Sequence, residues 1–134
     1  MNIEKVQIVD AIRHILEAKK EIPFTYIFGS FVDRETYRDI DVALYLENPK
    51  GVDTLRFELA LEEEMDKKLH IPLDVRVIND APLGFVYHVL AQKILVLDRD
   101  MDRRAGFESL IWREYFDFRH LLQEYLEEIK NAPV

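Results

Sequence analysis

The sequence contains no cysteine and only four glycines among its 134 residues. The absence of cysteine excludes disulfide bonds, thiolate zinc sites and cysteine nucleophiles, and it favours a cytoplasmic protein. No apolar run approaches the roughly 20 residues that cross a bilayer. The residues after Met1 also lack the basic and then apolar pattern of a signal peptide. We therefore expect a protein that has no disulfides and does not span a membrane.

Positive charge is also scarce. The chain has 18 basic against 26 acidic residues, which gives a formal net charge of −8. Proteins that bind nucleic acid need a basic surface to neutralise phosphates, so nucleic-acid binding is not expected. At 134 residues the chain is long enough to bury a core, and 49% of its residues are hydrophobic. The sequence contains no repeats. A single domain over residues 1–134 is expected.

The hydrophobic pattern predicts helices and strands in alternation. Helices are expected at 3–20, 53–69, 82–92 and 101–130, and strands at 24–28, 39–47, 73–78 and 94–97. Asp53 is expected to cap the second helix, and Pro82 suits the first position of the third. The buried stripe expected for the second helix is Phe57, Ala60, Leu61, Met65 and Leu69. Residues 31–38 are expected to form a turn or a single helical turn. The predicted fold class is α/β (α+β), a small mixed sheet of about four strands flanked by helices, with a long C-terminal helix.

One short region indicates chemistry. Gly29 and Ser30 follow the apolar strand 24–28, and Asp39 and Asp41 open the next apolar strand. Alternate residues of a strand point to the same face, so the two carboxylates lie side by side. Such a pair suits a divalent magnesium ion that carries a polyphosphate. Glycine lets the backbone approach a phosphate, and the serine supplies a hydroxyl.

A third carboxylate, Asp74, stands at the start of the strand 73–78. The helix that precedes it is long enough to bring this strand beside the one that carries Asp39 and Asp41. In nucleotidyl transfer a third acidic residue completes the site or helps to deprotonate the acceptor. The alternative is that Asp74 pairs with Arg76 on its own strand.

The order Phe-Gly-Ser, a short spacer, Asp-Ile-Asp-Val-Ala-Leu and a later apolar-Asp-apolar strand resembles the DNA polymerase β-like nucleotidyltransferase superfamily. More narrowly, it resembles the minimal nucleotidyltransferases, called MNT. The resemblance implies that Gly29 and Ser30 bind the nucleoside triphosphate. It also implies that Asp39 and Asp41 bind magnesium, with two ions expected, and that Asp74 is the third acidic residue and a further metal ligand.

The spacer departs from the family pattern. Eight residues separate Ser30 from Asp39, where many members have about ten with an Arg-Gly inside. Here Arg34 is present without a following glycine. By the resemblance Arg34 contacts the triphosphate, and the alternative is a solvated loop residue.

Members of this group are often encoded beside a HEPN-family partner, with which they form a toxin–antitoxin pair. The resemblance therefore implies a magnesium-dependent enzyme that transfers AMP from ATP to an acceptor hydroxyl, favouring a tyrosine of a HEPN toxin. One alternative is a non-catalytic antitoxin that neutralises its partner by forming a complex. A weaker alternative is transfer to a small molecule such as an antibiotic. In the toxin–antitoxin setting, the aromatic stripe of the last helix would contact the partner or form a homodimer.

Overall fold

A four-stranded sheet lies at the centre of the computed structural model, which describes residues 1–133. The strands are β1 (Phe24–Phe28), β2 (Ile40–Tyr45), β3 (Leu73–Val77) and β4 (Ile94–Asp98). Their order in the sheet is β3-β2-β1-β4. Strand β1 pairs antiparallel with β2 and β4, whereas β2 and β3 are parallel. The mixed four-stranded sheet predicted from the sequence is confirmed.

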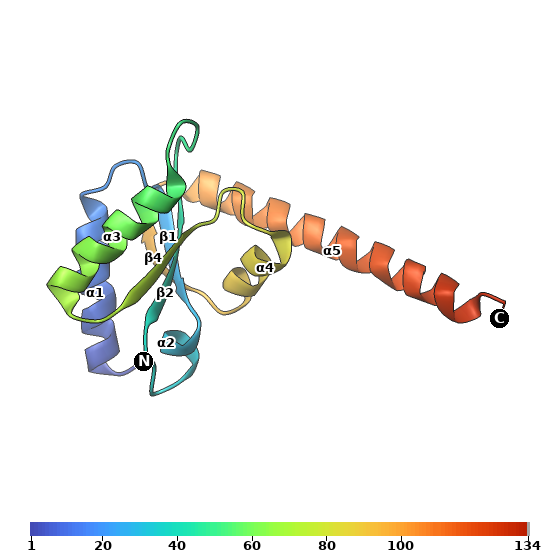
Figure 1. Cartoon of the computed structure of the whole chain (residues 1–134), viewed down its shortest axis with the longest axis horizontal. Helices are drawn as coiled ribbons and strands as arrows, with labels where there is room; N and C mark the ends of the chain where they lie inside the picture. Colours follow the sequence, from blue (N-terminus) through green and yellow to red (C-terminus); the bar gives the residue numbers. More distant parts are fainter. Residues whose placement is uncertain (134) are drawn as a thin grey trace.

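One helix precedes the first strand, others connect the strands, and a long helix follows the last strand (Figure 1). They are α1 (Ile3–Glu17), α2 (Ser30–Asp33), α3 (Thr54–Leu69), α4 (Leu83–Ala91) and α5 (Met101–Asn131). The predicted cap of α3 is confirmed, because the Asp53 side chain accepts a hydrogen bond from the amide of Arg56. Pro82 lies just before α4 rather than at its first position.

The predicted end of the first helix at residue 20 is wrong, since α1 ends at Glu17. A distant side chain accounts for this end. The Arg99 guanidinium donates hydrogen bonds to the carbonyls of Leu16, Glu17 and Lys19. Carbonyls at a helix end lack partners within the helix, and Arg99 supplies them. The periodicity of residues 3–20 contains no information about this contact.

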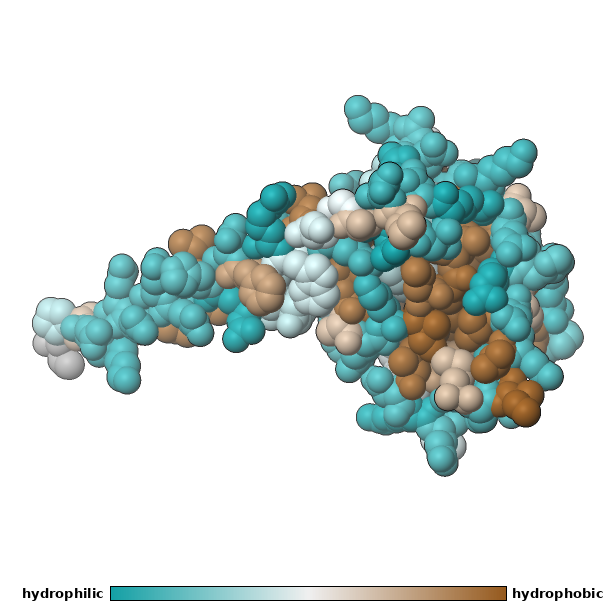
Figure 2. Space-filling view, turned by 180° about the vertical axis from the view of Figure 1, so that it is seen from behind, coloured by the Kyte–Doolittle hydropathy of each residue, from teal (hydrophilic) through white to brown (hydrophobic). Residues whose placement is uncertain are grey.

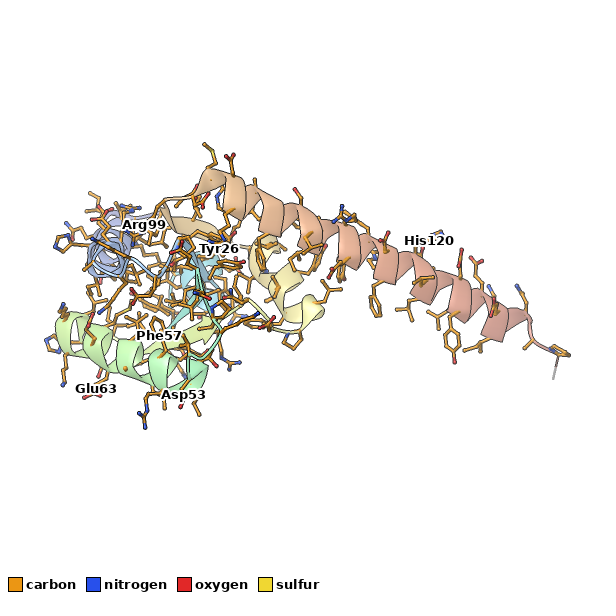
Figure 3. The ribbon with its side chains drawn as sticks, turned by 90° about the horizontal axis from the view of Figure 1, so that it is seen from above. Tyr26, Asp53, Phe57, Glu63, Arg99 and His120 are labelled. Atoms are coloured by element: carbon orange, nitrogen blue, oxygen red, sulfur yellow. The ribbon has the colours of Figure 1, made fainter. Side chains whose placement is uncertain are left out.

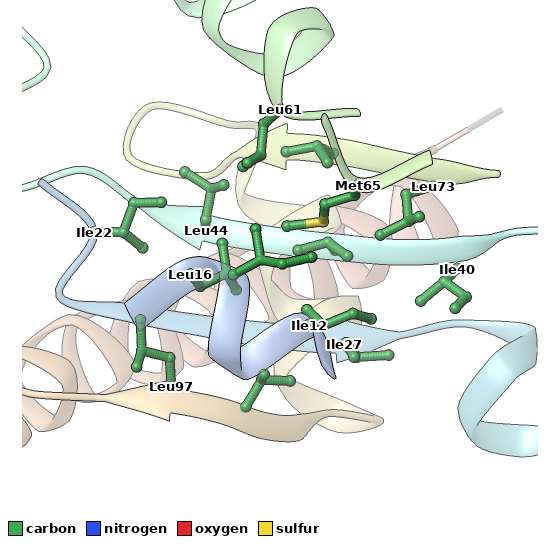
Figure 4. Close-up of a cluster of buried hydrophobic side chains, with 14 of the residues drawn as sticks. Ile12, Leu16, Ile22, Ile27, Ile40, Leu44, Leu61, Met65, Leu73 and Leu97 are labelled. Carbon is green, nitrogen blue, oxygen red and sulfur yellow. The ribbon is translucent and has the colours of Figure 1, made fainter. Parts of the chain in front are cut away.

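Helices α1 and α3 cover one face of the sheet. Strand β2 turns Ile40, Val42 and Leu44 toward this face, as its alternation predicts, and all three are fully buried. They pack with apolar side chains of both helices (Figure 4). The buried stripe predicted for α3 is only partly correct, because Ala60 is exposed.

Helix α4 and the first turns of α5 cover the other face of the sheet. Tyr26 points to this side, and its hydroxyl donates a 2.8 Å hydrogen bond to Glu108 of α5 (Figure 3). Lys93 and Arg104 also pair with Glu108, at 2.6 and 3.2 Å. These contacts join α5 to the sheet.

Beyond this contact α5 projects from the body of the molecule (Figure 1). Ile111 is buried, but every residue from Phe116 to Pro133 is exposed. The apolar stripe predicted along the helix therefore packs on the core only in its first half. Its second half carries apolar side chains among charged ones (Figure 2). Within residues 1–133, no helix has the length and apolarity needed to cross a membrane.

Candidate active site

The register of the sheet brings the predicted site residues together. Asp41 on β2 is the Cα partner of Asp74 on the parallel strand β3. On its other side Asp41 pairs with Phe28, the last residue of β1, which is followed directly by Gly29. The strand order thus places Asp41 between the third carboxylate and the turn that leads to Ser30.

Gly29 has a backbone conformation that other residues rarely adopt, with φ 81° and ψ −154°. An added Cβ atom would lie 2.2 Å from Oδ2 of Asp41, far inside van der Waals contact. The carboxylate of Asp41 therefore occupies the space that a side chain at position 29 would need. Glycine is required at this turn for both reasons.

The electrostatics of Asp41 reflect its neighbours. Partial burial raises the pKa of the Asp41 carboxyl above its ordinary value of 3.8. The negative charges of Asp39 and Asp74 raise the pKa further, while the charge of Arg76 opposes them. Three carboxylates thus interact at one place, as the sequence predicts, and a cation bound there would relieve their repulsion.

The alternative proposed for Asp74 is also present. Its Oδ1 lies 3.4 Å from Nε of Arg76, and both side chains are partly exposed to solvent. The pairing does not remove Asp74 from the acidic group, because it remains the register partner of Asp41. An exposed pair of this kind adds little stability and leaves Asp74 free to move.

A hollow of about 610 Å³ opens beside Asp39. Its lining residues are Ser30, Arg34, Thr36, Tyr37, Arg38 and Asp39. The volume is within the range of small-molecule sites, and two arginines give it the charge that phosphates require. Arg34 thus lines the same hollow as Ser30 and Asp39, and it is exposed to solvent.

Sequence reasoning missed Lys5 on α1, which hydrogen-bonds to the segment that lines this hollow. Lys5 is only 8% exposed, and its Nζ donates hydrogen bonds to the carbonyls of Phe31 and Arg34. The same ammonium lies 5.1 Å from the ring centre of Phe31 and 5.6 Å from that of Tyr37. Lys5 therefore holds the segment that runs from α2 to the hollow. A lysine on the apolar face of a helix was the only signal in the sequence.

The residues suit magnesium bound together with a nucleotide. Within residues 1–133 no three acidic or histidine side chains form a ready-made metal cage. Magnesium in nucleotide enzymes commonly uses one or two carboxylates and takes its other ligands from phosphates and water. Asp39 and Asp41 suit that role, because Asp41 is partly buried among negative charges that the charge of Arg76 opposes.

Comparison with known proteins identifies the family. The family described as "Polymerase beta, Nucleotidyltransferase" matches residues 10–102 of the sequence. The chain belongs to this nucleotidyltransferase family. The matched range contains every predicted site residue, from Gly29 to Asp74. It excludes Lys5 and nearly all of α5. No curated protein matches the sequence.

Solved structures with this nucleotidyltransferase fold include toxin–antitoxin complexes. A tri-AMPylated Shewanella oneidensis HEPN toxin in complex with MNT antitoxin aligns with a TM-score of 0.72 and 16% identity, over 94% of this chain and 98% of that chain. The toxin–antitoxin MntA-HepT aligns with a TM-score of 0.70 and 15% identity, over 93% and 98%. A toxin–antitoxin complex with AMP-PNP aligns with a TM-score of 0.67 and 17% identity, over 97% and 99%. These likenesses confirm the predicted fold.

Proposed function

We propose that this nucleotidyltransferase transfers AMP from ATP to the hydroxyl of a protein tyrosine, and that the acceptor is a HEPN-family toxin for which it is the antitoxin. The observation that carries the proposal is the register pair of Asp41 and Asp74 beside the Gly29 turn. The structural relatives named above support the choice of acceptor, because one contains an AMPylated HEPN toxin.

Each predicted residue has a role in this reaction. Ser30 and Arg34 bind the triphosphate in the hollow, and Asp39 and Asp41 hold magnesium with it. When bound, the metal would neutralise negative charge on the phosphates. The acceptor oxygen bonds to the α-phosphorus. The bond between the α-phosphorus and the oxygen that bridges to the β-phosphorus breaks, and pyrophosphate leaves. Asp74 completes the acidic site and takes the proton of the acceptor hydroxyl.

The test uses purified chain, magnesium, ATP labelled at the α-phosphate and the HEPN-family protein of the same genome. We expect label to appear on a tyrosine of the HEPN protein. Asp39→Asn combined with Asp41→Asn should abolish labelling while the protein stays folded. Asp66→Asn, which changes an exposed carboxylate on α3, should label at the wild-type rate. Undiminished transfer by the double variant would refute the metal assignment.

A non-catalytic antitoxin is the second candidate, because the outer half of α5 offers exposed apolar side chains for complex formation. Phe116, Phe118 and Tyr125 are each more than half exposed. In that case the double aspartate variant would still neutralise the toxin and bind it as tightly as the wild type. Toxin activity and complex formation, measured with the same variant, separate the two candidates.

A further inference from the structure

A second concave site lies next to Asp74. It is a groove of about 520 Å³ along the outer edge of β3, between α3 and α4. Asp74 lines this groove, whereas Asp39 lines the hollow described above. Asp41 lies between the two, because β2 separates β3 from the end of β1. The acidic residues therefore stand between a hollow suited to phosphates and a groove of different character.

We propose that this groove, called the β3 groove below, binds the segment of the acceptor protein that carries the modified tyrosine. The inference rests on the proposed function, and it adds the place and the chemistry of the acceptor. A segment bound there presents its hydroxyl to Asp74, while the nucleotide occupies the hollow on the other side of Asp41. The two substrates then meet at the carboxylates.

The walls of the β3 groove are apolar and partly open to solvent. Leu55 and Leu59 of α3 line one wall and are 63% and 55% exposed. Pro82 and Phe85 of α4 line the other wall. Exposed leucines beside an aromatic ring favour an occupant with apolar or aromatic side chains. A tyrosine in an apolar segment fits this requirement.

The floor of the groove is acidic and closed to strand pairing. The Glu58 carboxylate accepts a 2.8 Å hydrogen bond from the amide of Val77, and the Glu62 carboxylate accepts one of 2.9 Å from the amide of Val75. These amides belong to the edge strand β3, so an added strand is denied these two donors. The occupant therefore binds through its side chains.

The charge of the lining adds a second requirement. Glu58, Glu62 and Asp74 carry negative charge, and Arg76 is the only basic residue among the residues that line the groove. Each glutamate uses one carboxylate oxygen on β3, which leaves the other for the ligand. The groove thus selects a segment in which basic side chains flank the tyrosine.

Arg76 lies where the groove meets the acidic residues. Its guanidinium pairs with Asp74 and lies 5.9 Å from the ring centre of Phe85. A tyrosine ring that enters beside Phe85 would therefore meet Arg76 and then Asp74. This order places the phenolic oxygen, rather than the ring, next to the carboxylates.

The first test is Leu59→Asp, assayed by AMP transfer to the HEPN-family protein and by calorimetry with ATP and magnesium. We expect KM for the protein acceptor to rise at least tenfold and the affinity for ATP to stay within twofold of the wild type. Met101→Asp is the matched control, because Met101 is 66% exposed and does not line the groove. It should leave both values unchanged.

The second test removes charge and keeps the hydrogen bonds. Glu58→Gln with Glu62→Gln retains an amide oxygen to accept from Val77 and Val75, so the fold is preserved. We expect a several-fold rise in KM for the acceptor and a weaker dependence of KM on salt. Glu63→Gln, on the exposed face of α3, is the control and should change neither.

The outcomes separate this inference from the proposed function. If the wild type labels no protein, the proposed function fails. If the wild type labels the acceptor and Leu59→Asp does so with the same KM, the β3 groove is not the acceptor site. A fall in ATP affinity with Leu59→Asp would assign the groove to the nucleotide instead. Loss of self-association by Leu59→Asp, with an unchanged KM, would assign it to a second copy of the chain. Each of these three results for Leu59→Asp overturns the inference.

Discussion

The Oδ2 atom of Asp41 lies only 2.2 Å from the position that a Cβ atom on Gly29 would occupy. The turn after β1 and the carboxylate on β2 are therefore built as one unit. Neither residue can change without affecting the other. The first prediction follows from this contact.

Gly29→Ala should lower the free energy of unfolding by about 1–3 kcal/mol, because alanine is strained at φ 81° and its methyl group displaces the Asp41 carboxylate. AMP transfer should be lost with the displacement. Urea unfolding and the labelling assay measure the two effects. Gly106→Ala is the control, because it lies in α5 with open space around it. That variant should be stabilised by about 0.5–1 kcal/mol.

Asp41→Asn should stabilise the protein in the absence of nucleotide and metal, while it abolishes transfer. The pKa of Asp41 is raised by burial and by two neighbouring carboxylates, so the ionised form is unfavourable in the folded state. Since Asp41 is partly exposed, we expect a screened gain of about 0.5–1 kcal/mol. This gain corresponds to a rise in Tm of about 2–5 °C.

The pH dependence of that gain has a definite sign. When the pKa of a carboxyl is raised in the folded state, ionisation of that group destabilises the folded protein. The destabilisation develops as pH rises from the ordinary pKa of 3.8 through the higher folded pKa. The difference in Tm between Asp41→Asn and the wild type should therefore be small at pH 3 and largest near pH 7. Thermal melts across this range measure it. For Asp66→Asn, the difference in Tm from the wild type should not increase between pH 3 and pH 7.

Lys5→Met should weaken nucleotide binding although Lys5 touches no predicted site residue except through the backbone of Arg34. Methionine fills the buried space but leaves the carbonyls of Phe31 and Arg34 without their donor. We expect a loss of about 1–3 kcal/mol in the free energy of unfolding. Well below Tm, we expect a several-fold loss in affinity for ATP by calorimetry.

Two further variants isolate this effect of Lys5. Lys5→Arg retains a cation and hydrogen-bond donors, and it should restore part of the ATP affinity. Lys68→Met removes an exposed lysine of α3 and should change neither stability nor affinity. A loss of stability in Lys5→Met with unchanged ATP affinity would contradict the assigned role.

Glu108→Gln should loosen the attachment of α5 at neutral pH. Burial raises the pKa of Glu108, but hydrogen bonds from Lys93 and Tyr26, together with the charges of Lys93 and Arg104, lower the pKa below 4.5. The stability from this pairing is therefore present above pH 4.5 and is lost as pH falls through the lowered folded value. We expect a cost of about 1–3 kcal/mol at pH 7.

Urea unfolding at pH 7 and at pH 3 measures the effect of Glu108→Gln, which should be smaller at the lower pH. Glu124→Gln is the matched control, since Glu124 pairs with His120 on the exposed part of α5. That change should cost less than about 0.5 kcal/mol. An equal cost for Glu108→Gln at both pH values would contradict the ionic character of the contact.

The alternation of apolar residues predicted most of the elements correctly. Ile40, Val42 and Leu44 face the core as their period of two requires, and Asp53 caps α3 as predicted. Local patterns sufficed here because backbone conformation and the burial of one face are set by residues close in sequence. The roles of Asp39, Asp41 and Asp74 in catalysis stay predictions.

The amino-acid sequence alone determined the alternation of strands and helices, the Gly29 turn and the Asp39–Asp41 pair, since these depend on neighbouring residues. Tertiary structure decided that Asp74 lies beside Asp41, because strand register is set by the packing of whole elements. It likewise decided that Lys5 supports the hollow, that two glutamates close the edge of β3, and that half of α5 leaves the core. These features depend on whether residues distant in sequence meet, and periodicity carries no information about such pairs.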